Sequence, residues 1–133
     1  MGELIDGVNF IGVVAGAILS FLLGWLWYSP KLFGPKWAEG VGVEMNEANE
    51  LPAGAMISQI VGLFLMSWLV GVTAVSNALL TIILAVVAFA VLGYSGGMFR
   101  KNSAYSRVTD AGYLIASAVV MIICQGVTSA MVS

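Results

Sequence analysis

The stretch from Val8 to Tyr28 reads VNFIGVVAGAILSFLLGWLWY and contains no Lys, Arg, Asp or Glu. As a helix it is long enough to cross about 30 Å of hydrocarbon, the core of a bilayer. In lipid every backbone N–H and C=O group must be bonded within its segment, so a helix is the backbone that fits. Glu3 and Asp6 precede the stretch in place of a basic leader, and no persuasive cleavage site follows it. We therefore predict a retained membrane-spanning helix rather than a signal peptide.

Three further stretches, residues 53–75, 78–99 and 111–132, are equally long and equally free of charge. The whole chain is 60% hydrophobic and 9% charged, whereas soluble domains are about 25% charged. A water-soluble globule is the wrong class for this composition. We expect one all-α domain over residues 1–133, an integral membrane four-helix bundle with helices at about 8–28, 53–75, 78–99 and 111–132.

The basic residues predict the orientation of this bundle. Lys31 and Lys36 lie in the first connection, and Arg100, Lys101 and Arg107 lie in the third. Basic loops stay on the cytoplasmic side of a membrane, so both termini are expected outside, N-out and C-out. For a bacterial inner (cytoplasmic) membrane this means a multi-pass protein with two periplasmic termini.

The composition also argues against most kinds of chemistry. The chain has no histidine and a single cysteine, Cys124, so the usual ligands of zinc, haem and iron–sulfur clusters are missing. Histidine-dependent nucleophilic catalysis is excluded within one chain for the same reason. No dense basic patch exists for nucleic acid. We expect no catalytic residue, no metal and no cofactor; the expected partners are membrane lipids and other membrane-protein subunits or a second copy of the chain.

Small residues recur at intervals of four in the first two helices. Such spacing produces a smooth face along which two helices approach closely, and close packing is a main source of helix association in lipid. Two interpretations stay open, packing inside the bundle and an interface with a second subunit. The residues are Gly12, Gly16, Ser20 and Gly24 in the first helix and Gly54, Ser58 and Gly62 in the second.

Two interpretations also stay open for the glutamine side chains inside the apolar stretches. Gln125 lies in the fourth helix and Gln59 near the start of the second. A buried amide in lipid usually finds a hydrogen-bond partner on another helix. The alternative is a polar lining for a pore or substrate route. Helices broken midway or charged within the membrane, which are typical of transporters, are not visible in the sequence.

A weak internal repeat leaves a further question open. Tyr28 and Phe33 recur as Tyr94 and Phe99 at one common spacing along the chain. A duplicated helical hairpin would produce this pattern, and so would coincidence.

The segment 24–37 reads GWLWYSPKLFGPKW, and residues 109–113 read TDAGY. Both resemble elements of a bacterial four-helix membrane family known as domain of unknown function 1761. The resemblance implies the architecture and a bacterial source, and it carries no activity.

Both elements are expected at the cytoplasmic boundary, where they would form a common docking or lipid-headgroup site. Asp110 is expected to cap the fourth helix, because a carboxylate stabilises free N–H groups at a helix start. The alternative is an ion or headgroup site that Asp110 forms with basic residues. The expected boundary site is Tyr28, Ser29, Pro30, Phe33, Trp37, Asp110 and Tyr113, with Arg100, Lys101 and Arg107 as lipid-headgroup candidates.

These features favour a non-enzymatic integral inner-membrane protein that acts by helix packing. It would be an accessory or structural subunit of a larger membrane complex, or a homo-oligomer. A small oligomeric channel or transporter is the alternative, with Gln125 and Gln59 in its lining. A membrane enzyme acting on lipid or quinone through Asp110 is the least favoured class.

Overall fold

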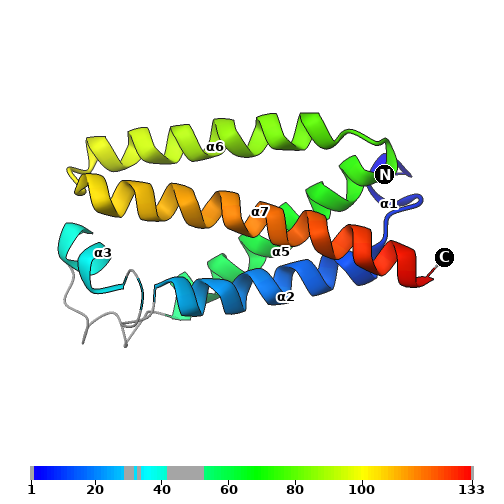
Figure 1. Cartoon of the computed structure of the whole chain (residues 1–133), viewed down its shortest axis with the longest axis horizontal. Coiled ribbons are helices and arrows are strands. Elements are labelled where there is room, and N and C mark those ends of the chain that lie inside the picture. Colours follow the sequence, from blue (N-terminus) through cyan, green and yellow to red (C-terminus); the bar gives the residue numbers. More distant parts are fainter. Residues whose placement is uncertain (1, 29–31, 33, 42–52, 133) are drawn as a thin grey trace.

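The computed structural model describes residues 2–28, 32, 34–41 and 53–132 of the chain (Figure 1). Every regular element in these ranges is a helix, which confirms the all-α expectation. Four of the helices are long and apolar enough to cross a membrane, so the chain has the fold of a multi-pass membrane protein. The helices are α1 (Gly2–Ile5), α2 (Phe10–Trp27), α3 (Gly34–Val41), α5 (Ala53–Val75), α6 (Leu79–Phe99) and α7 (Ala104–Val132).

The spanning helices begin and end at identifiable signals. Asn9 caps α2, since its side-chain oxygen accepts from the backbone N–H of Gly12 at 3.2 Å. The hairpin between α5 and α6 turns at Asn77, whose φ of 53° lies in the left-handed region, and asparagine tolerates that conformation better than most residues. The predicted bounds of α5 are those observed.

The start of α7 was predicted wrongly. The helix begins at Ala104 rather than Ala111, because the serine hydroxyl of Ser103 accepts from the backbone N–H of Ser106 at 3.1 Å and caps it. The sequence prediction stopped at Asp110 because charge marked the end of the apolar run. A helix does not need to end where its apolar section does, and the first turns of α7 are polar.

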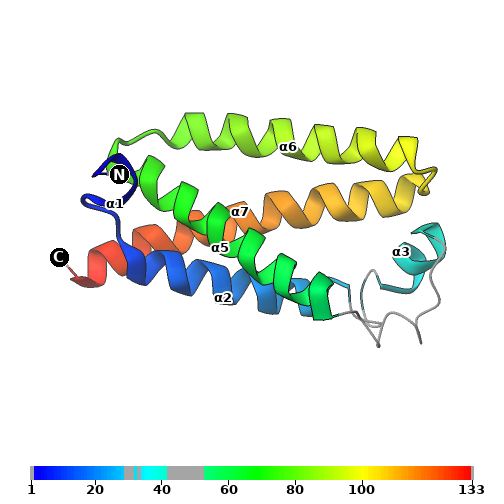
Figure 2. The ribbon, with the colours of Figure 1, turned by 180° about the vertical axis from the view of Figure 1, so that it is seen from behind.

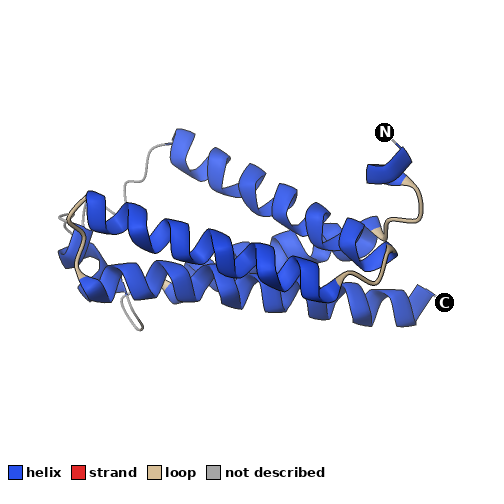
Figure 3. Ribbon diagram, turned by 90° about the horizontal axis from the view of Figure 1, so that it is seen from above, coloured by secondary structure: helices blue, strands red, loops and turns tan. Residues whose placement is uncertain are grey.

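The bundle is organised around α7, which packs against α2, α5 and α6. Helix α6 lies at the edge, beside α7. Figures 2 and 3 both show that α5 ends beside the start of α6 at their hairpin and that the two helices diverge toward the α3 end, where α5 begins. The buried apolar core is small and comes from three of the helices: Leu63 and Val70, Ile82 and Val86, and Ala118 and Met121.

Large apolar side chains cover the outside of the bundle. Leu80 and Leu84 on α6 are 81% and 70% exposed. A soluble monomer rarely exposes contiguous apolar surface of this extent, and lipid is the solvent that accepts it. The fold therefore buries few side chains and leaves most of its apolar surface to the membrane.

The two ends of the bundle differ. Both termini lie at one end, and α3 with the turn between α6 and α7 lies at the other (Figure 1). Helix α3 packs on the first turns of α7, where Ala38 is 1% exposed. The Ser106 hydroxyl donates to the Trp37 carbonyl at 2.9 Å, and the Ser103 N–H donates to the Gly40 carbonyl at 3.1 Å. The end that carries α3 also holds Lys36, Arg100, Lys101 and Arg107.

Candidate functional site

The small residues of α2, which we call the α2 face (Gly12, Gly16, Ser20 and Gly24), point into the bundle. A methyl group on Gly16 would lie 2.6 Å from Ser67 Oγ and 3.3 Å from the Cα atom of Met121. One on Gly24 would lie 2.6 Å from the hydroxyl of Tyr113. A methyl group at either position would force its neighbours to shift, so these two glycines let α5 and α7 approach the backbone of α2.

Polar side chains complete the packing of the α2 face. The Ser67 hydroxyl donates to the Val13 carbonyl at 2.7 Å, and the Tyr113 hydroxyl donates to the Ser20 carbonyl at 2.7 Å. Both donors are buried. Each hydroxyl donates to a backbone carbonyl of a neighbouring helix, because a buried polar group in apolar surroundings needs a hydrogen-bond partner.

Gln125 lies where α2, α5 and α7 meet. Its amide nitrogen donates to the Asn9 carbonyl at 3.1 Å, and a methyl group on Gly12 or Gly71 would stand 2.8 or 3.1 Å from that nitrogen. Gln125 is buried, whereas Gln59 is exposed at the other end of the bundle. The structure therefore does not bring these two glutamines together.

The small residues of α5, which we call the α5 face (Gly54, Ser58 and Gly62), are exposed. Among the residues that the structure describes, nothing lies within 4 Å of the position that a methyl group on Gly54 or Gly62 would take. The buried residues of this part of the helix, Leu63 and Ser67, lie on the opposite side. The α5 face thus points away from the bundle.

An aromatic and acidic cluster forms at the α3 end of the bundle. The hydroxyl of Tyr28 and the indole N–H of Trp37 donate to the same carboxylate oxygen, Oδ1 of Asp110, at 2.6 and 2.9 Å. The rings of Trp37 and Tyr113 lie 5.1 and 5.5 Å from that of Tyr28, both edge to face. The structure brings these four expected boundary residues together; Ser29, Pro30 and Phe33 lie outside the described residues.

Asp110 does not cap a helix start, because α7 begins at Ala104. Its carboxylate joins the end of α2 and the side of α3 to α7 instead. Burial, and after it the hydrogen bond and negative charge of Asp110, raise the pKa of Tyr28 above its ordinary value. The hydroxyl therefore stays protonated at neutral pH and remains a donor to the carboxylate.

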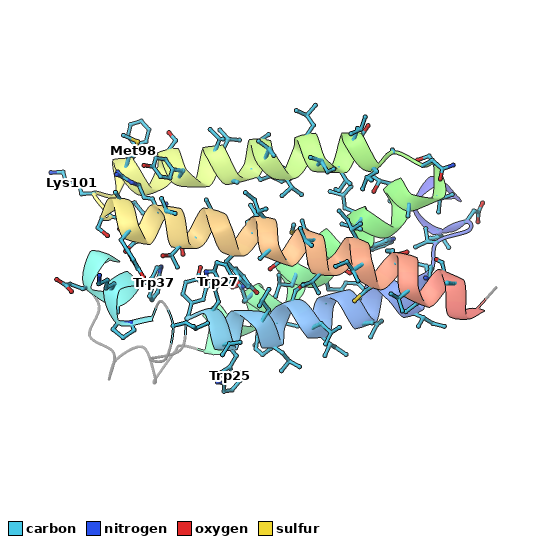
Figure 4. All side chains as sticks on the ribbon, viewed as in Figure 1. Trp25, Trp27, Trp37, Met98 and Lys101 are labelled. Atoms are coloured by element: carbon cyan, nitrogen blue, oxygen red, sulfur yellow. The ribbon has the colours of Figure 1, made fainter. Side chains whose placement is uncertain are left out.

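Trp27 belongs to this cluster, although it is not one of the residues expected to form the boundary site. Its indole N–H donates to the Thr109 carbonyl at 3.0 Å, and its ring covers Gly112, where a methyl group would lie 3.2 Å from Cζ2. Trp27 lies between α2 and α7 and Trp37 lies on α3, whereas Trp25, two residues before Trp27, points away from the bundle (Figure 4). The sequence Trp25-Leu26-Trp27 alone did not indicate which of the two tryptophans faces the bundle.

Basic side chains surround the same end. Lys36 Nζ lies 5.3 Å from the ring centre of Tyr105, and the guanidinium carbon of Arg107 lies 4.8 Å from that of Tyr94. Arg100 and Lys101 are exposed in the turn between α6 and α7. The residues that the structure describes contain no group of three or more His, Cys, Asp or Glu side chains placed to hold a metal ion.

Residues 11–132 match the model of a family described as "Protein of unknown function (DUF1761)". The match spans all four apolar helices. No curated protein and no solved structure matches the chain.

Proposed function

The chain belongs to the DUF1761 family, and we propose that it acts without catalysis, by packing its helices against another membrane subunit or another copy of itself. In this proposal it is an accessory or structural subunit, or a homo-oligomer, in a bacterial inner membrane. The basic end with α3 faces the cytoplasm, and the end with both termini faces the periplasm, as the positive-inside rule requires.

The observation that supports this function is the space beside Gly54 and Gly62 on the α5 face, which no other described residue fills. Apolar helices gain little hydrophobic energy by leaving lipid for each other, so they associate where small residues let their backbones approach. Gly54 and Gly62 offer such an approach, and nothing in the described chain uses it.

The α2 face shows how such a surface is used within the chain itself. It has the same spacing of small residues, and it is covered by side chains of α5 and α7. The chain thus already uses this kind of surface to hold helices together. A helix from outside the chain is the matching occupant for the α5 face.

Gly62→Leu tests the proposal, with Gly126→Leu as the matched control. Both glycines have open space for a side chain within the described chain, but Gly126 lies on α7, away from the α5 face. Gly62→Leu should weaken association about tenfold or more, equivalent to about 1.4 kcal/mol, and Gly126→Leu should leave it unchanged. The readouts are the particle mass in mild detergent by light scattering and the chemical cross-linking of native membranes.

Three results would contradict the proposal. The first is a strictly monomeric, partner-free wild-type chain in both assays, and the second is equal behaviour of the two variants. The third is ion or solute flux through liposomes that contain only the purified chain, which would favour a channel. The thermal stability of both variants, measured in parallel, separates lost association from unfolding.

A further inference from the structure

The turn that joins α6 to α7 gathers side chains that carry hydrogen-bond donors. A methyl group on Gly97 would lie 2.7 Å from Cγ of Arg107 and 3.7 Å from the amide nitrogen of Asn102. One on the preceding glycine, Gly96, would lie 3.3 Å from a terminal nitrogen of Arg100. Three side chains that carry donors therefore lie beside two consecutive glycines.

The backbone holds this turn in a defined shape. Lys101 has a φ of 62°, in the left-handed region. Its N–H donates to the Met98 carbonyl at 3.0 Å, and the Asn102 N–H donates to the Gly97 carbonyl at 2.9 Å. These bonds close the end of α6 and keep the charges of Arg100 and Lys101 at the end of the hairpin.

Arg107 lacks an anionic partner among the described residues. Its Nε atom is shielded from solvent and has no hydrogen-bond partner, and the structure records no ion pair for this side chain in the described part of the chain. The ring of Tyr94 faces the guanidinium, which offsets part of the cost of removing the cation from water. The nearby carboxylate of Asp110 already accepts from Tyr28 and Trp37. A partly buried cation of this kind favours an anion supplied from outside the chain.

The surface next to the turn is strongly apolar. Leu92, Met98 and Phe99 on the last turns of α6 are 67%, 55% and 86% exposed. Met98 and Lys101 lie at the same end of the bundle (Figure 4). An anion bound here would stand directly above acyl chains that lie along α6.

We propose that the turn between α6 and α7 binds the phosphate group of an anionic phospholipid through Arg107, Arg100, Lys101 and Asn102. A guanidinium matches phosphate geometry with two parallel N–H donors, and basic pockets beside membrane helices are suited to anionic headgroups. The apolar surface of α6 favours a lipid over free phosphate, because only a lipid contacts both regions. This site is separate from the α5 face.

The test uses the full chain in nanodiscs of phosphatidylcholine with about one-fifth phosphatidylglycerol, since the basic cluster attracts the anionic component. Lipid that stays with the protein after mild extraction is quantified by mass spectrometry. The wild-type chain should retain phosphatidylglycerol over phosphatidylcholine, and Arg107→Gln should reduce this preference about fivefold or more. Lys36→Gln removes one charge from the same end of the bundle, outside the turn, and should leave the preference unchanged.

Lys101→Gln keeps the test valid if Arg107→Gln fails to fold. The Lys101 side chain is exposed, so its replacement should leave the fold intact. It should reduce the preference about two- to fivefold while the melting temperature stays that of the wild type. Equal losses in Lys36→Gln and Arg107→Gln would overturn the proposal in favour of a diffuse surface charge, as would a wild-type chain with no preference. Displacement of the lipid by millimolar inorganic phosphate would show a free-anion site and would also overturn it.

Discussion

The α2 face and the α5 face have the same spacing of small residues and opposite surroundings. Ser67, Met121 and Tyr113 cover the first, and no residue in the described part of the chain covers the glycines of the second. Small residues at intervals of four therefore permit close approach without specifying the partner. Whether the partner belongs to the same chain depends on how the other helices are placed.

The largest effect should come from filling the α2 face. Gly16→Leu would drive a side chain into Ser67 and into the backbone of Met121, which cannot give way as a flexible side chain can. Overpacking usually costs about 1–3 kcal/mol, and we expect at least about 3 kcal/mol against the backbone here. Unfolding by denaturing detergent, followed by helical ellipticity, measures the loss. The comparison fails if Gly62→Leu destabilises the isolated monomer as much.

The next largest effect concerns the end of the same packed region, where Asp110 joins α2 and α3 to α7. Asp110→Ala leaves the donors of Tyr28 and Trp37 without their acceptor, and hydrogen bonds to a charged group are worth about 1.5–3 kcal/mol. We expect a loss of about 2 kcal/mol and greater quenching of tryptophan fluorescence by acrylamide as α3 loosens.

Asp110→Asn keeps an acceptor oxygen at this position and should cost about half as much, because charge-assisted bonds are about twice as strong as neutral ones. If Asp110→Asn or Trp37→Ala changes bound lipid or complex formation while stability is retained, the cluster is a docking site. If either one lowers stability alone, the cluster is structural.

A smaller loss of stability is expected when either of two buried serines, Ser67 or Ser20, is replaced by alanine, and the two losses should differ. Ser67 Oγ donates to Val13 at 2.7 Å, whereas Ser20 Oγ lies 3.4 Å from the Ser117 carbonyl, and both serines are fully buried. Ser67→Ala should cost about 1 kcal/mol, within the range for hydrogen bonds between membrane helices, and Ser20→Ala should cost less. Equal losses in the same unfolding assay would show that burial, rather than hydrogen-bond geometry, sets the cost.

The smallest effect should come from Gly54→Ala. The added methyl group has no neighbour within 4 Å in residues 2–28, 32, 34–41 and 53–132, and alanine restricts the unfolded chain more than glycine does. The monomer should be unchanged or more stable by up to about 0.5 kcal/mol. Gly24→Ala, which would press on Tyr113, should be destabilising in the same assay. The α5 face would not be open if Gly54→Ala lowered the melting temperature of the monomer.

The sequence predicted the spanning helices well because each is an uncharged run of the required length. The bounds of α5 agree at both ends, and α6 differs at its start by a single residue. Helix α3 was not predicted, since the glycine and proline at its start, Gly34 and Pro35, are also common in irregular connections. Proline fits the first turn of a helix equally well, and only the packing of Ala38 on α7 decides between the two.

The boundary cluster was predicted in part. Topology alone brings the end of α2 and the start of α7 to one side of the membrane, so the meeting of Tyr28 with Asp110 followed from the order of the helices. The sharing of one carboxylate oxygen by Tyr28 and Trp37 required the position of α3. The sequence could not indicate it, because no spacing rule relates α3 to a helix so far along the chain.

The burial of Cys124 has a practical consequence. It is the single cysteine of the chain and is 7% exposed, so a membrane-impermeant maleimide should find no target on the intact protein. Lys101→Cys and Ser129→Cys would each introduce the sole accessible thiol, one at either end of the bundle. Labelling of the two cysteine variants from opposite sides of the membrane would establish the orientation of the protein. The unsubstituted chain is the negative control.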